Sequence, residues 1–133
     1  MANGLPIPGT WAYKSYRNTA QQQVFGAGIF TFTTPTSSTL NGTLDMGGGL
    51  VLDLDGTITP ASQDCPLTVH IIGNGRPGTD TQDWEYDYHG YLGFHWPNGV
   101  DQVASLVGTI VRAKPHNGGA AGVTASFIAI KQS

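Results

Sequence analysis

The stretch Leu50-Val51-Leu52-Asp53-Leu54-Asp55 decides the fold class of this chain. Its leucines recur at every second position, while the positions between them change from valine to aspartate. Successive side chains of a strand point to opposite faces, so the pattern predicts a strand with one face in a core and a second, more polar face. The expected strand covers Leu50–Thr59. It follows Gly47-Gly48-Gly49, whose residues adopt positive φ without steric penalty and so predict a tight connection.

Runs with the same period recur along the chain, and they are separated by turn residues drawn largely from its 19 glycines and 8 prolines. The other expected strands are Gly9–Arg17, Val24–Thr34, Thr39–Met46, Leu67–Ile72, Trp84–Phe94, Gln102–Lys114 and Val123–Lys131. Helix signals are nearly absent, and the Gln-rich segment Thr19–Val24 is interpreted as a polar loop because it has no apolar periodicity. The segment Gly73–Asp83 is expected to be a turn-rich loop.

About eight strands joined by short turns favour an all-β fold, an antiparallel up-and-down β-barrel formed by a single domain over residues 1–133. Closing the barrel removes the sheet edges, which matters because these strands carry little charge to prevent edge pairing. Small residues expected to face inward would let the strands bend; they are Gly28, Gly42, Gly56, Gly90 and Gly108. A β-sandwich is the alternative.

Charge and hydropathy narrow the classes of partner. A net charge of -3, with 6 Lys and Arg residues spread along the chain, does not supply the basic stripe that nucleic-acid binding needs. No run of 18 apolar residues is present, so we expect a soluble protein without a membrane partner. The start of the chain has no signal-peptide pattern, which indicates a cytoplasmic protein, although a removed signal peptide would leave no trace.

Charged residues make up only 11% of the chain, and this weakly charged surface predicts a homo-oligomer. The chain holds 1 cysteine, Cys65, which rules out an internal disulfide. Because free cysteines are among the most buried residue types, we expect Cys65 to be buried.

The motif Gly9-Thr10-Trp11, at the start of the first expected strand, resembles the Gly-x-Trp signature of the calycins, which include the lipocalins and avidin-like barrels. The segments Leu40-Asn41-Gly42-Thr43-Leu44 and Ser105-Leu106-Val107-Gly108-Thr109 are similar to avidin-like strands. The resemblance implies a barrel closed at one end by Trp11, with an interior cavity for small, often apolar molecules. The biotin-contacting residues of avidins have no match here, so biotin binding is not implied.

The densest set of chemically active residues is Asp83-Trp84-Glu85-Tyr86-Asp87-Tyr88-His89-Gly90-Tyr91. In a strand, Trp84, Tyr86 and Tyr88 share one face, while Glu85, Asp87 and His89 share the other with Tyr91 and His95. If the aromatic face lines a lumen, it suits stacking on a flat ligand. If the acidic face points inward, it could supply a general acid and base. In the simplest interpretation the aromatics fill the core and the acids face water.

A metal site and an arginine are two further candidates for function. A metal at Asp87 and His89 would need a ligand from a neighbour such as His70 or His95, and without a metal spacing signature we expect no metal site and no cofactor. Arg112 could clamp a carboxylate ligand, or its side chain could simply extend to water from a strand end.

The first functional hypothesis is a small-molecule-binding barrel for an apolar or aromatic ligand. Its expected cavity or lid residues are Trp11, Tyr13, Trp84, Tyr86, Tyr88 and Trp96. The second hypothesis is a cofactor-independent isomerase, cyclase or lyase, with catalysis by Asp87, His89 or Glu85 as base and a tyrosine or Arg112 as electrophile. The third hypothesis is a lectin-like module whose exposed aromatic residues bind sugars. Burial of Trp84 with exposure of Asp87 and His89 would favour the first, and aromatic residues exposed at loop tips the third.

Overall fold

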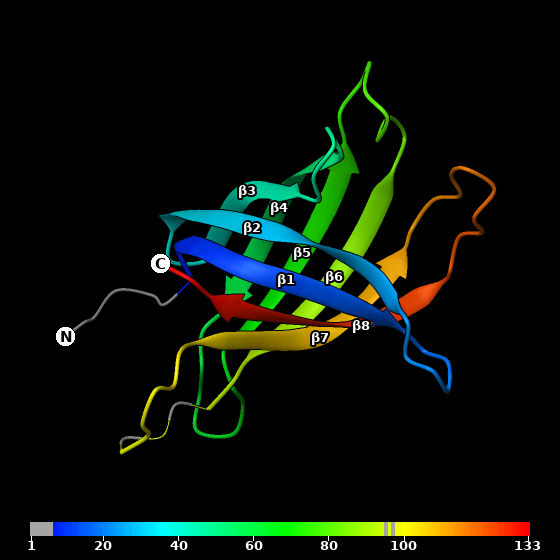
Figure 1. Cartoon of the computed structure of the whole chain (residues 1–133). Helices are drawn as coiled ribbons and strands as arrows, with labels where there is room; N and C mark the ends of the chain where they lie inside the picture. Colours follow the sequence, from blue (N-terminus) through cyan, green and yellow to red (C-terminus); the bar gives the residue numbers. More distant parts are fainter. Residues whose placement is uncertain (1–6, 95, 97) are drawn as a thin grey trace.

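The computed structural model describes residues 7–94, 96 and 98–133. Eight antiparallel strands form one closed barrel in which each strand pairs with its neighbours in the sequence and the first pairs with the last (Figure 1). The strands are β1 (Gly9–Arg17), β2 (Val24–Thr36), β3 (Thr39–Asp45), β4 (Val51–Thr59), β5 (Thr68–Gly75), β6 (Glu85–Leu92), β7 (Ser105–Arg112) and β8 (Thr124–Lys131). The predicted up-and-down barrel is therefore confirmed. Among the described residues no helix is long and apolar enough to cross a membrane.

The barrel closes through β1 and β8, which pair from Trp11 opposite Lys131 to Arg17 opposite Ala125. The amide of Gln132 donates to the carbonyl oxygen of Thr10 at 2.7 Å, so the hydrogen-bond ladder continues past the end of β8. As a result neither strand presents a free edge, which is how a barrel avoids edge-to-edge association.

The strand β5 extends three residues further than the sequence indicated, because Gly73-Asn74-Gly75 belongs to the strand and not to a loop. Asn74 pairs with Asp53 on β4 and with Glu85 on β6, so ladders on both sides hold this segment extended. Local turn propensity is overridden here by pairing on both edges. Gly73 faces the interior, where a Cβ would lie 3.2 Å from the side chains of Leu54 and Tyr88.

Four of the five glycines predicted to face inward lie against the backbone of a neighbouring strand; they are Gly28, Gly42, Gly56 and Gly108. A Cβ on Gly108 would overlap the carbonyl oxygen of His89 on β6, and one on Gly42 would overlap that of Thr31 on β2. In the β3–β4 turn, Gly47, Gly48 and Gly49 have φ values of 84°, 63° and 83°, which are left-handed conformations that favour glycine.

The inward face of the strands forms the core. Leu52 and Leu54 are buried while Asp53 and Asp55 are exposed, as the alternation in this strand predicts. One end of the barrel is closed by Trp11, which is completely buried and donates its indole N–H to the carbonyl oxygen of Ile7 at 2.9 Å. Thus the implied role of Trp11 as an end closure agrees with the structure.

The expectation that Cys65 is buried is wrong, since its side chain is exposed. The residue lies in the β4–β5 loop, where its amide and carbonyl exchange hydrogen bonds with Ser62. Cysteines are usually buried because most of them lie in elements that pack against a core. Cys65 lies instead in a surface loop outside the barrel wall, where its side chain has no core to pack against.

Candidate functional site

A pocket of about 380 Å³ lies at the end of the barrel opposite Trp11. The β1–β2, β3–β4, β5–β6 and β7–β8 connections all lie at this end (Figure 1). The lining residues are Tyr13, Arg17, Phe25, Gly26, Ala27, Met46, Leu50, Leu52, Trp84, Tyr86, Tyr88, Arg112, His116 and Asn117. Strand residues thus form the walls, while turn residues form the mouth.

Five of the fourteen described residues that line the pocket are Phe, Trp or Tyr. Phe25, Trp84 and Tyr86 lie near the mouth, and the rings of Phe25 and Tyr86 meet edge to face with centroids 6.3 Å apart. Tyr13 and Tyr88 lie deeper and are nearly inaccessible to solvent. Burial raises the pKa of both phenols well above the usual value of 10.0, so both are neutral. The wall therefore offers apolar ring surface together with neutral hydroxyl groups.

A polar cluster at the mouth joins Tyr86, Arg112 and His116. The Tyr86 hydroxyl lies 2.7 Å from Nε2 of His116, and Arg112 Nε donates to the same hydroxyl at 3.3 Å. Arg112 Nη1 also donates to the carbonyl oxygen of Ala120 at 3.4 Å, so the β7–β8 loop helps to hold the guanidinium. Arg112 is the last residue of β7 and points inward. The β7–β8 loop then folds back and places His116 beside it.

His116 is held between an aromatic face and a positive charge. Its ring stacks on Trp84 with centroids 4.2 Å apart and an interplanar angle of 17°. Burial, and then the charge of Arg112, lower the pKa of His116 below its usual value. Its Nδ1 is buried and, among the described atoms, has no hydrogen-bond partner. A buried polar atom without a partner costs free energy, which a hydrogen bond from a ligand or water would recover.

The mouth of the pocket carries positive charge. Arg17 and Arg112 both lie over the ring of Phe25, at 5.7 Å and 5.6 Å from its centroid. None of the described residues that line the pocket is an Asp or Glu. The two guanidinium groups therefore face a pocket whose own lining supplies no carboxylate to neutralise them.

Only some of the residues predicted to bind ligand line the pocket. Tyr13, Trp84, Tyr86 and Tyr88 line the pocket. Trp11 does not, because it fills the closed end of the barrel, and the interior between it and the pocket is packed with core side chains. Trp96 does not either, because it lies in the β6–β7 connection, at the end of the barrel away from the pocket, where 65% of it is exposed.

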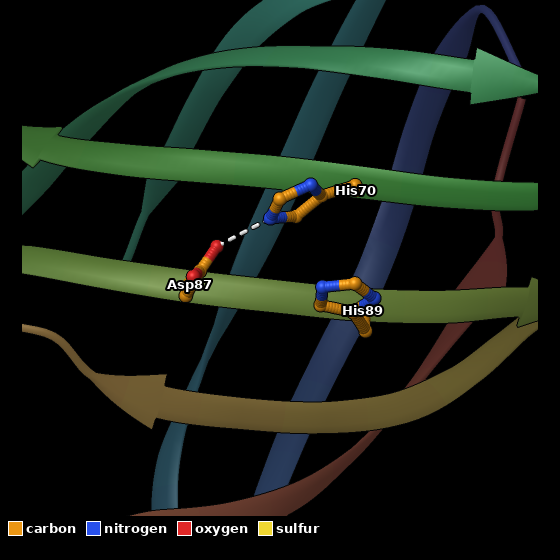
Figure 2. Close-up of side chains that lie close together, drawn as sticks. All are labelled: His70, Asp87 and His89. Carbon is orange, nitrogen blue, oxygen red and sulfur yellow. Dashed lines mark hydrogen bonds and ion pairs between the residues drawn. The ribbon is translucent and has the colours of Figure 1, made fainter. Parts of the chain in front are cut away.

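The residues predicted to be catalytic do not all share one site. Arg112 lines the pocket, but Glu85, Asp87 and His89 alternate with the buried residues of β6 and so lie on the outer wall. An acid–base pair in a dry interior required the acidic face to point inward, and this condition is not met. Glu85 instead lies 3.4 Å from Lys114, and Asp87 lies 2.7 Å from His70 (Figure 2). His95 lies outside the described residues.

Sequence reasoning missed His116, Arg17 and Phe25. His116 follows Pro115 and precedes Asn117-Gly118-Gly119, a pattern that indicates only a turn. Phe25 turns toward the pocket because the β1–β2 register shifts between Ser15 and Tyr16, which a strictly alternating pattern does not reveal.

Comparisons with known proteins support the architecture. No family model and no curated protein matches the chain. Among solved structures, the chain is similar to a redesigned β barrel, b11L5F_LGL, with a TM-score of 0.54 and 16% identity over 96% of this chain and 93% of that one. It is also similar to EF1p2_mFAP2b bound to DFHBI, with a TM-score of 0.54 and 15% identity over 96% of this chain and 94% of that one. At these identities the likeness shows that the chain shares their β-barrel fold.

Proposed function

We propose that this protein binds a small, flat aromatic molecule carrying a negatively charged group, in the pocket at the open end of the barrel. The observation that carries the proposal is the combination of an aromatic wall with the Arg112–Tyr86–His116 cluster, in a pocket where none of the described lining residues is an Asp or Glu. This arrangement has the form of a ligand site, which is typically apolar with a few placed polar groups.

The size and chemistry of the pocket favour such a ligand. A volume of about 380 Å³ lies near the lower end of the range for small-molecule sites. Ring faces attract planar aromatic molecules through stacking. A guanidinium pairs with a carboxylate or sulfonate more strongly than with a neutral acceptor, because charge-assisted hydrogen bonds are about twice as strong. One of the similar barrels is bound to DFHBI, which supports the view that this architecture accommodates a small molecule.

A matched pair of fluorescent probes tests the proposal. Anilinonaphthalene sulfonate and N-phenylnaphthylamine share the aromatic framework, but only the first is an anion. We expect both to bind, and Trp84→Ala to weaken both. We expect Arg112→Gln to weaken the sulfonate about tenfold or more, because it removes a charged hydrogen-bond donor, and to leave the amine nearly unchanged.

The control is Arg76→Gln, which removes an arginine that pairs with Asp53 and does not line the pocket. Circular dichroism verifies that each variant keeps the fold. If neither probe binds, or if Trp84→Ala and Arg112→Gln bind both probes as the unaltered protein does, the proposed function is wrong.

A second candidate function rests on a different part of the surface. Phe94 and Trp96 are 73% and 65% exposed, and their rings meet edge to face with centroids 4.7 Å apart. Exposed aromatic residues in a loop favour the lectin hypothesis, because sugars stack on such rings. A glycan array would test it: binding that disappears in Trp96→Ala supports this function, and an array without signal contradicts it.

A further inference from the structure

A second group of functional side chains stands on the outer wall, away from the pocket. His70 on β5 and Asp87 and His89 on β6 each offer one ligand atom, and these atoms all lie within 4.8 Å of one another (Figure 2). We propose that these residues bind a divalent first-row transition-metal ion, with Zn²⁺ as the representative ion.

The types of ligand select this class of metal. Two imidazoles and one carboxylate suit borderline ions such as Zn²⁺, whereas Ca²⁺ and Mg²⁺ prefer sites made of oxygen atoms. Three protein ligands with one remaining position for water is a common arrangement for an accessible zinc ion.

The strand register brings the ligands together. His70 lies directly opposite His89 in the β5–β6 ladder, and Asp87 lies opposite Ile72, two residues along from His70. The imidazole rings stack with centroids 4.1 Å apart at 29°, and Nε2 of His70 lies 2.7 Å from Oδ1 of Asp87. Both strands also pair with a further neighbour, so the backbone beneath the three ligands is fixed on each side.

Small side-chain movements would complete the site. Zinc bonds of about 2.0–2.1 Å in a tetrahedral site place ligand atoms about 3.3 Å apart. Because no two of the three ligand atoms are more than 4.8 Å apart, the widest separation has to close by about 1.5 Å at most. The side chains of His70 and Asp87 are 44% and 37% exposed, so they can change rotamer without disturbing the core.

The remaining coordination position would face solvent. The residues opposite the two histidines on the flanking strands are Thr57 on β4 and Thr109 on β7, and both are exposed and short. The metal would thus be reached from outside the barrel, independently of the ligand pocket. Failure of the metal proposal would leave the proposed ligand binding intact, and the reverse also holds.

Isothermal titration calorimetry of the full chain without a histidine tag tests the inference, with ZnCl₂ as titrant and CaCl₂ as the hard-cation comparison. We expect one Zn²⁺ per chain and no heat from Ca²⁺. We expect His70→Gln, Asp87→Asn and His89→Gln each to weaken Zn²⁺ binding by more than about tenfold, because loss of even an outer-shell partner of a metal ligand costs 10–100-fold.

The matched controls are His116→Gln, a histidine at the pocket, and Asp55→Asn, an exposed carboxylate on β4. Both should bind Zn²⁺ as the unaltered protein does. Because all three ligands lie outside the core, the variants should keep the barrel, which circular dichroism verifies. Co²⁺ gives a second readout, since its visible absorption reports tetrahedral coordination and should disappear in the same three variants.

Absence of Zn²⁺ binding at millimolar concentration would overturn the proposal. Binding that persists in all three ligand variants, or that disappears in His116→Gln, would assign the metal to another place and overturn it as well.

Discussion

His116 combines three contacts that no single stretch of sequence contains: stacking on Trp84, a hydrogen bond to Tyr86, and the charge of Arg112 nearby. These contacts tie the β7–β8 loop to the start of β6. The ring is partly buried, and its Nδ1 has no partner among the described atoms. The pKa of His116 should therefore respond to changes in the pocket around it.

The first prediction concerns the ionisation of His116. Its pKa is lowered from the usual 6.5, first by burial and then by Arg112. Because the unfolded chain then takes up this proton at a higher pH than the folded chain, the contribution of His116 to stability is lost as the pH falls below about 6.5. Histidine NMR titration should give a midpoint below this value. Arg112→Gln should raise the midpoint and Arg76→Gln should not; a midpoint unaffected by Arg112→Gln would contradict the assigned cause.

The second prediction compares two tryptophans with different environments. Trp11 is completely buried and Trp96 is 65% exposed. Trp11→Ala should lower the free energy of unfolding by about 3–5 kcal/mol, because it leaves a cavity in a closed core. Trp96→Ala should change it by less than about 0.5 kcal/mol. Urea denaturation followed by far-UV circular dichroism measures both, and equal effects would show that Trp11 does not close the barrel.

At the scale of elements, close strand packing depends on glycines that face inward. The third prediction is that Gly108→Ala lowers the free energy of unfolding by about 1–3 kcal/mol, because the new Cβ would overlap the carbonyl oxygen of His89 and force β6 and β7 apart. Thr109→Ala, at the next and outward position of β7, serves as the control and should change stability by less than about 0.5 kcal/mol. If Gly108→Ala left the free energy of unfolding unchanged, the two strands would separate easily and the prediction would be wrong.

The elements also show the limit of local patterns. The presence of each strand could be predicted from the sequence, because alternation with period two is visible within a few residues. The end of β5 could not, since Gly73-Asn74-Gly75 resembles a turn locally and is held as a strand only by β4 and β6. Similarly, Phe25 enters the pocket through a shift in the pairing of β1 with β2 that has no signature in either strand.

At the scale of the whole molecule, closure places the start of β1 beside the end of β8. The hydroxyls of Thr10 and Ser133 lie 2.7 Å apart. The fourth prediction is that a circular permutant, with a flexible linker between the original ends and new ends between Gln63 and Asp64 in the exposed β4–β5 loop, keeps the barrel spectrum and a cooperative unfolding transition.

A permutant opened within β4, between Leu54 and Asp55, is the comparison and should not fold, because it removes pairing to β3 and β5 together. Failure of the loop permutant with success of the strand permutant would contradict the closed topology. Self-association, expected from the low surface charge, stays a prediction; native mass spectrometry at working concentration would test it.

The sequence by itself determined that the chain forms about eight strands and favoured an antiparallel barrel over a sandwich, because alternation and turn chemistry act between residues close in the chain. It left open which face of the strand predicted at Trp84–Phe94 points inward, and only the structure shows that the face with Tyr86 and Tyr88 is buried. Tertiary structure alone decided which end stays open and which polar groups meet. Tyr86 and His116 are 30 residues apart, and His70 and Asp87 are 17 residues apart. Their contacts follow from strand register and loop path, which depend on how the whole barrel packs and so are not encoded in any local pattern.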